Sequence, residues 1–222
     1  MNTIANTAYY CCGVGMEDAE REFSVVNDVY AKRFMDERGL EIVKPFKSET
    51  VPNISNITRC RIIDDIVSDE LSKDRIANVA AIGAGFDTRP YRLNGGVWTE
   101  IDDPQIIDYK NAKLPIVECP NTLSRISIGF SSESLADKLA AVGINLPVII
   151  VIEGVSMYLD QRSIREMLRC SPVVALTARR CLFVSKCISM TALEKHFPEY
   201  LRRTTNLNRR AILGLIQRLE EA

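Results

Sequence analysis

The stretch of sequence that decides the fold is residues 75–93, which read R-I-A-N-V-A-A-I-G-A-G-F-D-T-R-P-Y-R-L. An apolar run of small and branched residues stops at Gly83-Ala84-Gly85, which is typical of a buried parallel strand that ends in a ligand-binding turn. Glycine at positions 83 and 85 permits positive backbone dihedral angles and lets a ligand approach the main chain closely. We therefore expect a binding loop here, and a tight strand-to-helix turn without a ligand is the alternative.

The two residues that follow this turn indicate the charge of the ligand. A dinucleotide-binding loop, G-x-G-x-x-G, faces a pyrophosphate, but in this chain Thr88 stands where the third glycine belongs. Asp87 would repel a phosphate at short range and would attract a cation. The loop therefore favours a cationic ligand.

Composition narrows the class of protein. A chain of 222 residues with 46% hydrophobic residues is long enough for one large α/β domain, and a formal net charge of -1 gives no attraction to nucleic acid or to an anionic membrane. The longest strongly apolar segment, residues 146–152, is too short to cross a bilayer, and the N-terminus lacks the pattern of a secretion signal. Seven cysteines without a C-x-x-C pair favour small apolar side chains in a reducing compartment over a metal site. We expect a cytoplasmic protein with no bound metal.

The N-terminal part of the chain predicts helices. Residues 16–38 carry apolar side chains at helical spacing and predict one long helix, which Gly39 would end. Residues 43–56 contain two prolines and predict an irregular connection, and a second helix is expected over about residues 58–71.

Strands and helices then alternate. Strands are predicted over residues 97–101, 123–128, 147–152 and 181–187, in addition to the strand before Gly83, and helices over residues 104–114, 131–142 and 160–169. This order indicates an α/β fold with a doubly wound, mostly parallel sheet. We divide the chain into a helical N-terminal cap or lid at 1–72, a ligand-binding core at 73–188 and a helical tail at 189–222. Simple packing of the first segment against the sheet is the alternative to a lid.

Carboxylates stand where two of the predicted strands end, which is where such sheets bind ligands. Asp102 follows Gly85 by seventeen residues, and a carboxylate there is suited to accept hydrogen bonds from both hydroxyls of a ribose. Asp103 lies directly before Pro104 and is better placed to cap a helix. Glu153 ends the fourth strand, where a buried charge needs either a cationic ligand or a nearby arginine. NAD and S-adenosylmethionine both contain a ribose, so Asp102 does not distinguish them. The negative charge of Asp87 favours S-adenosylmethionine, whose sulfonium is a cation.

Three motifs together resemble a known family. G-A-G-F-D-T-R-P-Y-R-L, E-I-D-D-P and V-I-E-G-V-S-M-Y-L, in this order and spacing, are similar to those of the leucine carboxyl methyltransferase-like family, and most similar to its bacterial polyketide-type branch. The upstream segments T-A-Y-Y-C-C-G-V and R-C-R-I-I-D-D extend the resemblance over residues 7–168. It implies a class I, Rossmann-like methyltransferase that uses S-adenosylmethionine to methylate an oxygen of a small molecule, either a carboxylate or a hydroxyl.

The resemblance also implies roles for individual residues. The loop of Gly83, Ala84 and Gly85 would lie against the methionine and ribose, Asp102 would bind the ribose hydroxyls, and Glu153 would line the same pocket. Arg59 would pair with the cofactor carboxylate, and Arg61 is the competing candidate for that role. Arg89 and Arg92 are expected to brace Asp87 or neighbouring helices.

The sequence departs from the family pattern at two places. Relatives carry an acidic residue after the third strand, near the adenine, where this chain has Gly129 followed by Phe130, so Phe130 or the backbone would replace that contact. Residues 188–222 predict helix where such sheets end in an antiparallel hairpin. Either the sheet is shortened at this end, or a partner subunit, for example in a homo-oligomer, supplies the missing elements. These departures motivate a non-catalytic subunit of the same fold as an alternative function, and an NAD-dependent oxidoreductase is a third.

No catalytic base stands out. His196, the single histidine, lies outside every motif, and a carboxylate acceptor needs no base because it is ionised at neutral pH. Tyr9, Tyr10 and Tyr158 are candidates for lining an acceptor pocket, and packing is the alternative for each. The identity of the acceptor stays open.

Overall fold

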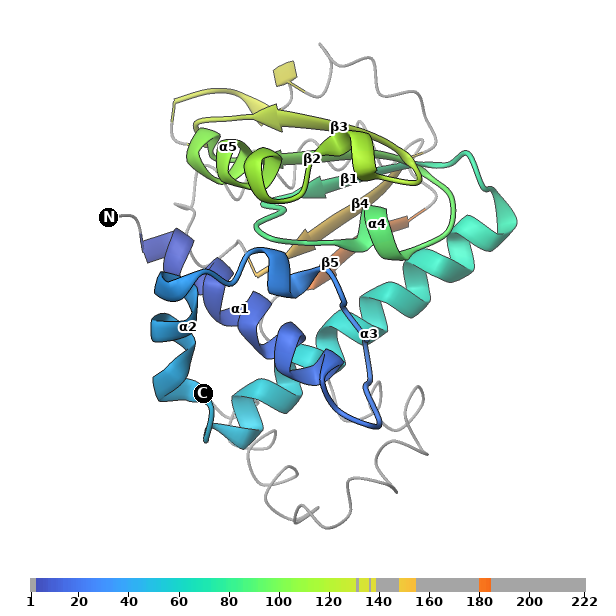
Figure 1. Cartoon of the computed structure of the whole chain (residues 1–222). Helices are drawn as coiled ribbons and strands as arrows, with labels where there is room; N and C mark the ends of the chain where they lie inside the picture. Colours follow the sequence, from blue (N-terminus) through green and yellow to red (C-terminus); the bar gives the residue numbers. More distant parts are fainter. Residues whose placement is uncertain (1–2, 131, 136, 139–147, 155–179, 185–222) are drawn as a thin grey trace, which may run out of the picture.

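The computed structural model describes residues 3–130, 132–135, 137–138, 148–154 and 180–184 (Figure 1). The predicted helix at 160–169, the tail at 189–222, Tyr158 and His196 lie outside these residues, as does half of the predicted helix at 131–142. Within the described part of the chain, no helix is long and apolar enough to cross a bilayer.

A five-stranded sheet forms the centre of the molecule, and each pair of neighbouring strands in it is parallel (Figure 1). Its order is β3-β2-β1-β4-β5, with the strands at Asn78–Ile82 (β1), Val97–Asp102 (β2), Thr122–Ser127 (β3), Val148–Glu153 (β4) and Arg180–Val184 (β5). The strand order reverses at β1, and ligands bind at such a switch point in open α/β sheets. The predicted doubly wound α/β fold is confirmed.

The register brings the predicted binding segments to one edge of the sheet. Ile82, the last residue of β1, pairs with Ile101 on one side and with Ile152 on the other. The glycine turn, Asp102 and Glu153 each follow directly after one of these three residues in the chain. Three elements far apart in sequence therefore meet at the carboxyl ends of neighbouring strands.

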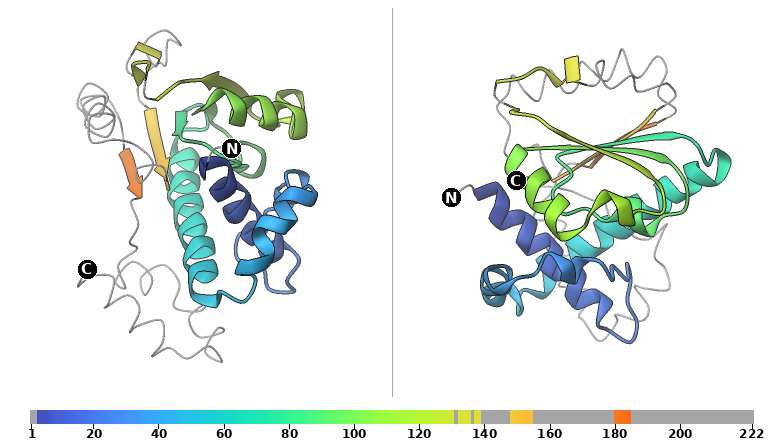
Figure 2. Two further views of the ribbon diagram at one scale, coloured as in Figure 1. Left: turned by 90° about the vertical axis from the view of Figure 1, so that its left-hand side faces the viewer. Right: turned by 45° about the horizontal axis from the view of Figure 1, so that its top comes forward.

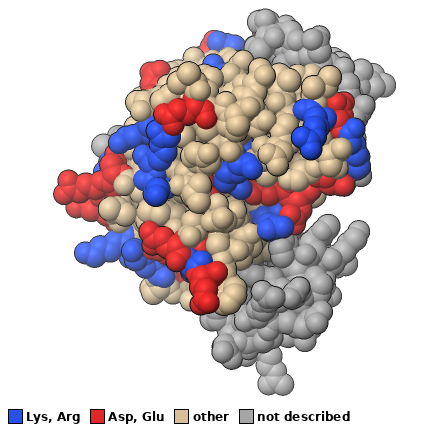
Figure 3. All heavy atoms as spheres, turned by 45° about the vertical axis from the view of Figure 1, so that its right-hand side comes forward, with Lys and Arg blue, Asp and Glu red and all other residues tan. Residues whose placement is uncertain are grey.

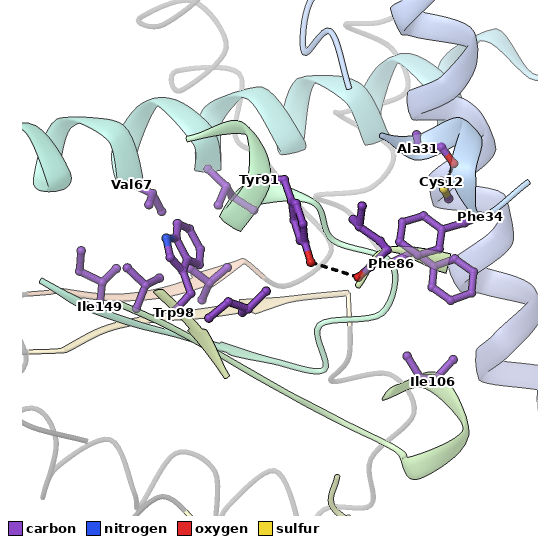
Figure 4. Close-up of a cluster of buried hydrophobic side chains, with 14 of the residues drawn as sticks. Cys12, Ala31, Phe34, Val67, Phe86, Tyr91, Trp98, Ile106 and Ile149 are labelled. Carbon is purple, nitrogen blue, oxygen red and sulfur yellow. Dashed lines mark hydrogen bonds between the residues drawn. The ribbon is translucent and has the colours of Figure 1, made fainter. Parts of the chain in front are cut away.

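Both faces of the sheet bury apolar side chains, which explains why the central strands β1 and β4 are almost continuously apolar. Val79 and Ala80, neighbours in β1, belong to two different hydrophobic clusters, as expected for side chains that alternate between faces. The larger cluster surrounds Trp98, which is fully buried and donates its indole N–H to the carbonyl of Gly95 (Figure 4). Val67 and Tyr91 also belong to this cluster.

The N-terminal helices lie together on one side of the sheet (Figure 2). They are α1 (Thr3–Ala19), α2 (Glu37–Val43) and α3 (Thr50–Lys73), with short 3-10 turns at Ala31–Arg33 and Lys44–Phe46. The long helix predicted over residues 16–38 is wrong, because α1 ends at Ala19. The predicted helix at 58–71 exists but begins eight residues earlier, at Thr50, so the irregular connection predicted over 43–56 is mostly helical.

Local hydrogen bonds explain why the predicted long helix does not form. Asp18 is almost fully buried, and its carboxylate accepts hydrogen bonds from the backbone N–H groups of Val25 and Val26 and from the Ser24 hydroxyl. Such side chain to backbone bonds compete with a helix. Asn27 adopts a positive φ of 55°, and Phe23, which the periodicity placed on an apolar face, is 70% exposed.

Gly39 was predicted to end a helix, but it lies inside α2. Asp36 caps this helix by accepting a hydrogen bond from the N–H of Gly39 at 3.0 Å. A Cβ atom at position 39 would lie 2.7 Å from the ring of Tyr9. The glycine is therefore explained by the close approach of α1 and α2.

The helix predicted over residues 104–114 is confirmed: α5 (Pro104–Lys113) begins with Pro104 directly after the cap residue Asp103. A further short helix, α4 (Arg89–Arg92), follows the glycine turn and was not predicted. The Asp103 carboxylate accepts from the N–H of Gln105 at 3.0 Å. The capping role expected for Asp103 is confirmed.

Candidate functional site

A cavity of about 460 Å³ opens at the carboxyl ends of β1, β2 and β4, and α1 and α3 contribute to its wall. Six residues predicted as a binding site from sequence all line it: Arg59, Gly83, Ala84, Gly85, Asp102 and Glu153. Arg61 does not. Its guanidinium pairs with Asp65 at 2.8 Å and donates to the carbonyl of Val25, on a partly exposed surface.

The turn after β1 has the backbone that the sequence predicts. Gly83 and Gly85 have φ angles of 67° and 48°, a region that residues with a Cβ rarely adopt. The N–H of Gly83 donates to the carbonyl of Ile101 at 2.8 Å, which ties the turn to the end of β2. Gly154, after β4, also has a positive φ, and a Cβ atom there would meet no atom of the described residues within 4 Å. The backbone is thus open to a ligand on both sides of the switch point.

Asp102 is held by the backbone alone. Its Oδ2 atom accepts a hydrogen bond from the N–H of Gly85 at 2.6 Å, and Oδ1 accepts from the N–H of Asp103 at 2.7 Å. Burial raises the pKa of Asp102 despite these two hydrogen bonds. No cation of the described chain forms an ion pair with it, and each oxygen can accept a further hydrogen bond.

Glu153 lies between two arginines. The Arg59 Nε atom is 2.7 Å from one of its oxygens, and the Arg89 Nη2 atom is 2.9 Å from the other. Burial pushes the pKa of Glu153 up, but the charges of Arg89 and Arg59 outweigh burial and leave that pKa below its usual value. The sequence left two ways to balance the charge of Glu153, a cationic ligand or a nearby arginine, and the structure contains nearby arginines.

Arg89 and Arg92 brace their surroundings, as predicted. The Arg89 guanidinium is buried and pairs with Asp87 at 2.7 Å and with Asp64 of α3 at 2.6 Å. Arg92 pairs with the other oxygen of Asp64 at 2.6 Å. Burial raises the pKa of Asp87, yet Arg89 and its other donors leave it below the usual value. Asp87 lines the cavity as expected, but its charge is already compensated by a protein cation.

Asp28 also lines the cavity and was missed from the sequence. Its Oδ2 accepts from the Thr88 hydroxyl at 2.7 Å, and its Oδ1 accepts from the N–H groups of Tyr30 and Ala31. Its one ion pair, with the Nε of Arg92, is long at 3.7 Å. Burial raises the pKa of Asp28. The role of Asp28 was missed because residues 16–38 were predicted as one continuous helix. Within a helix, its side chain would not accept hydrogen bonds from the backbone N–H groups that follow it.

Several neutral side chains complete the wall. Asn56 of α3 donates to the Cys11 thiol at 3.1 Å, and Cys60 lies 3.6 Å from Glu153. Burial raises the pKa of both thiols, which keeps them protonated. Gly129 and Phe130, which follow β3, also line the cavity.

The two described tyrosine candidates pack elsewhere. Tyr9 is nearly fully buried, and its ring lies 5.1 Å from that of Phe86 in an edge-to-face arrangement. The Tyr10 hydroxyl donates to Asn53 at 2.7 Å. Neither lines the cavity, so the packing alternative holds for both.

The parallel sheet, the glycine turn after β1, the carboxylate after β2 and the cavity at the switch point define a Rossmann-like α/β protein with a site for a nucleotide-type ligand. Comparison with known proteins identifies the family. Residues 12–171 match the model of the leucine carboxyl methyltransferase family, and the chain belongs to that family.

Two curated relatives have related names. A protein of Mycolicibacterium gilvum, provisionally named an S-adenosyl-L-methionine-dependent methyltransferase, is 32% identical over 110 residues, which cover 46% of this chain and 36% of the relative. A protein of Streptomyces avermitilis with the same kind of name is 25% identical over 165 residues, which cover 68% of this chain and 58% of the relative. The matched part of the chain thus spans between about a third and three fifths of these relatives.

Proposed function

We propose that this protein is an S-adenosylmethionine-dependent O-methyltransferase that acts on a carboxylate or hydroxyl of a small molecule. The observation that carries the proposal is the placement of Asp102 and the Arg59–Glu153 pair in one cavity, together with the glycine turn. Membership of the leucine carboxyl methyltransferase family and the names of the two relatives support it.

The residues of the cavity fit the parts of this cofactor. Each oxygen of Asp102 has spare acceptor capacity, which suits the two hydroxyls of a ribose. Arg59 and Glu153 offer a cation beside an anion, which suits the carboxylate and ammonium of an amino acid. The positive φ of Gly83 and Gly85 leaves backbone without Cβ atoms beside the ligand. When bound, the cofactor would supply a methyl group activated by its sulfonium.

The chemistry asked of the protein is positioning and the exclusion of water. Among the described residues that line the cavity there is no histidine, and the raised pKa values of Cys11 and Cys60 make these thiols poor bases. An acceptor that is already anionic needs no proton removed. These facts favour a carboxylate or an acidic hydroxyl as acceptor, held in line with the methyl group.

Two features of the wall bear on the remaining predictions. Five residues of α1 line the cavity, which supports the cap or lid role proposed for the segment 1–72: Thr7, Ala8, Cys11, Cys12 and Gly15. Phe130 lines the cavity after β3 and is suited to pack against an adenine. On the face shown in Figure 3, acidic and basic side chains are interspersed, and a protein without a nucleic acid partner remains our prediction. A cytoplasmic location and a homo-oligomer also remain predictions.

Calorimetry and a turnover assay test the proposal. We expect S-adenosylmethionine to bind with one site per chain and NADH to give no heat, because Asp28, which has only a long ion pair, disfavours a pyrophosphate. Transfer of a radiolabelled methyl group to a panel of carboxylic acids and phenols then tests catalysis. Binding without transfer to any member would favour the non-catalytic subunit, and tight NADH binding would favour the oxidoreductase.

A further inference from the structure

The cavity carries more negative than positive charge. Eight charged residues of the described chain line it, five acids against three arginines: Asp28, Asp87, Asp102, Asp103, Glu153, Arg59, Arg89 and Arg92. Lys110, which acts electrostatically on Asp87 and Asp102, is itself held by Glu100 at 2.6 Å. The wall therefore has a net charge of about minus two and is suited to a ligand with a net positive charge.

The excess negative charge is not spread evenly over the wall of the cavity. Glu153 and Asp87 are 2.7 to 2.9 Å from their arginines, and their pKa values lie below the usual range. Asp28 is 3.7 Å from its one cation, and Asp102 forms no ion pair in the described chain. Burial raises the pKa of both. Among the described residues of the wall, Asp28 and Asp102 are therefore the two buried carboxylates that have no short ion pair.

Asp28 and Asp102 differ in how they can act on a ligand. Asp102 offers acceptors to neutral ribose hydroxyls, which are the same in the methylated cofactor and in the demethylated product. Asp28 has three of its hydrogen bonds filled by Thr88, Tyr30 and Ala31, so it acts on a ligand mainly through its charge. Gly15 lies beside it, and even a Cβ atom there would be 3.9 Å from Asp28 Oδ2. At position 15, α1 therefore places no side chain against the carboxylate, and both residues line the cavity.

Methyl transfer changes the net charge of the ligand. S-adenosylmethionine carries an ammonium, a carboxylate and a sulfonium, and thus a net charge of plus one. In the reaction an acceptor oxygen forms a bond to the methyl carbon, the sulfur to carbon bond breaks, and its electron pair stays on sulfur. The product, S-adenosylhomocysteine, is a neutral thioether with the same ribose and the same amino-acid end.

We propose that Asp28 makes the cavity select the charged cofactor over the spent product, so that methyl transfer itself weakens the hold on the product. This inference rests on the proposed function. Before transfer, the ligand's extra positive charge adds to the weak compensation that the Asp28 carboxylate receives from Arg92, 3.7 Å away. After transfer that added charge is lost, and Asp28 is again only weakly compensated in a buried setting, which favours dissociation of the product.

The test compares three ligands by calorimetry: S-adenosylmethionine, S-adenosylhomocysteine, and sinefungin, in which an ammonium-bearing carbon replaces the sulfonium. For the unmodified protein we expect both cationic ligands to bind at least about 10-fold more tightly than the neutral thioether. This comparison needs no variant. Equal affinities for the three would overturn the inference and leave the proposed function intact, whereas no binding of any of them would overturn both.

The variant Asp28→Asn then assigns the effect to Asp28. The amide oxygen can keep the hydrogen bonds from the N–H groups of Tyr30 and Ala31, and the amide NH2 can donate to the Thr88 hydroxyl, so folding is preserved. We expect the ratio of the two dissociation constants to shrink about 5-fold or more, mainly through weaker binding of S-adenosylmethionine. The matched control is Asp65→Asn, a partly exposed acid outside the cavity, which should leave the ratio unchanged. An unchanged ratio in Asp28→Asn would overturn the assignment.

Discussion

Two buried ion networks lie on the same sheet and serve different ends. The first, which we call the rear cluster, consists of Glu100 of β2, Lys110 of α5 and Arg125 of β3, and none of the three lines the cavity. The second, which we call the pocket network, contains three arginines and four acids: Arg59, Arg89, Arg92, Asp28, Asp64, Asp87 and Glu153. Both are rich in short ion pairs, so burial and pairing alone do not distinguish a structural cluster from a binding site.

The difference lies in what each network leaves unfilled. In the rear cluster, each oxygen of Glu100 has its own cation, at 2.6 and 2.8 Å, and the remaining Arg125 donors bond to Asn111, Leu114 and Tyr91. The pocket network has one acid more than it has arginines, and it borders a cavity. A buried network thus indicates a binding site when it has unused charge or hydrogen-bonding capacity that faces a cavity.

The largest effect is expected from the rear cluster. Lys110→Met leaves the fully buried Glu100 with one cation instead of two, and we expect a loss of about 3 to 5 kcal/mol in the free energy of unfolding. Urea denaturation measures it. In the control Lys73→Met, whose lysine is half exposed and solvent-screened, the loss should be much smaller. Equal losses in the two variants would break the distinction that we draw.

The next effect concerns binding and not folding. Asp102→Ala removes both ribose contacts, and hydrogen bonds to a charged group contribute about 1.5 to 3 kcal/mol each, so affinity for S-adenosylmethionine should fall about 100-fold or more. Calorimetry at a temperature where the variant is folded measures this. Asp65→Ala provides the control with unchanged affinity. An unaltered dissociation constant in Asp102→Ala would remove the ribose role.

A smaller effect distinguishes two neighbouring arginines. Arg59→Met removes the cation proposed for the cofactor carboxylate but leaves Glu153 paired with Arg89, so we expect roughly 10-fold weaker binding and little change in stability. Arg61→Met, two residues away on α3, removes only a partly exposed pair and should not alter binding. The reverse outcome would transfer the carboxylate role to Arg61.

The smallest effect is a pH dependence that separates binding from folding. The pKa of Asp102 is raised above its unfolded value near 3.9, so as the pH falls from 7 this carboxylate is protonated before an ordinary aspartate would be, and cofactor binding weakens. Glu153 and Asp87 have lowered pKa values, so the stability that they contribute is present above about pH 4 and is lost only as pH falls through their folded pKa values. Affinity should therefore decline before the melting temperature does. A parallel decline of the two would contradict this.

The core of the fold and most of the proposed site residues could be predicted from the sequence because they depend on local signals, whereas Arg59 was expected only from the family resemblance. An apolar run before Gly83, a cap at Asp103 and a carboxylate at the end of a strand each have a short-range physical cause. Parallel strands then place these signals at one edge of the sheet. Asp102 and Glu153 were therefore found without knowledge of their partners.

The N-terminal segment could not be predicted in this way, because its conformation depends on contacts that periodicity does not encode. Asp18 and Asp28 turn the chain by bonding to backbone N–H groups, and these bonds prevail over the helical spacing of apolar residues. The pairing of Glu153 with Arg89, 64 positions earlier in the chain, is likewise a product of tertiary structure. The local signal for this turn was the position of Asp28 itself, two residues before Tyr30, whose N–H donates to its carboxylate.

A crystal structure of this protein grown with S-adenosylhomocysteine tests the central claim most directly. We predict that the ligand occupies the cavity at the carboxyl ends of β1, β2 and β4. Its ribose hydroxyls should bond to the Asp102 carboxylate, and its amino-acid end should lie at Arg59 and Glu153. A ligand bound elsewhere, or bound in this cavity with its ribose away from Asp102, would contradict the account.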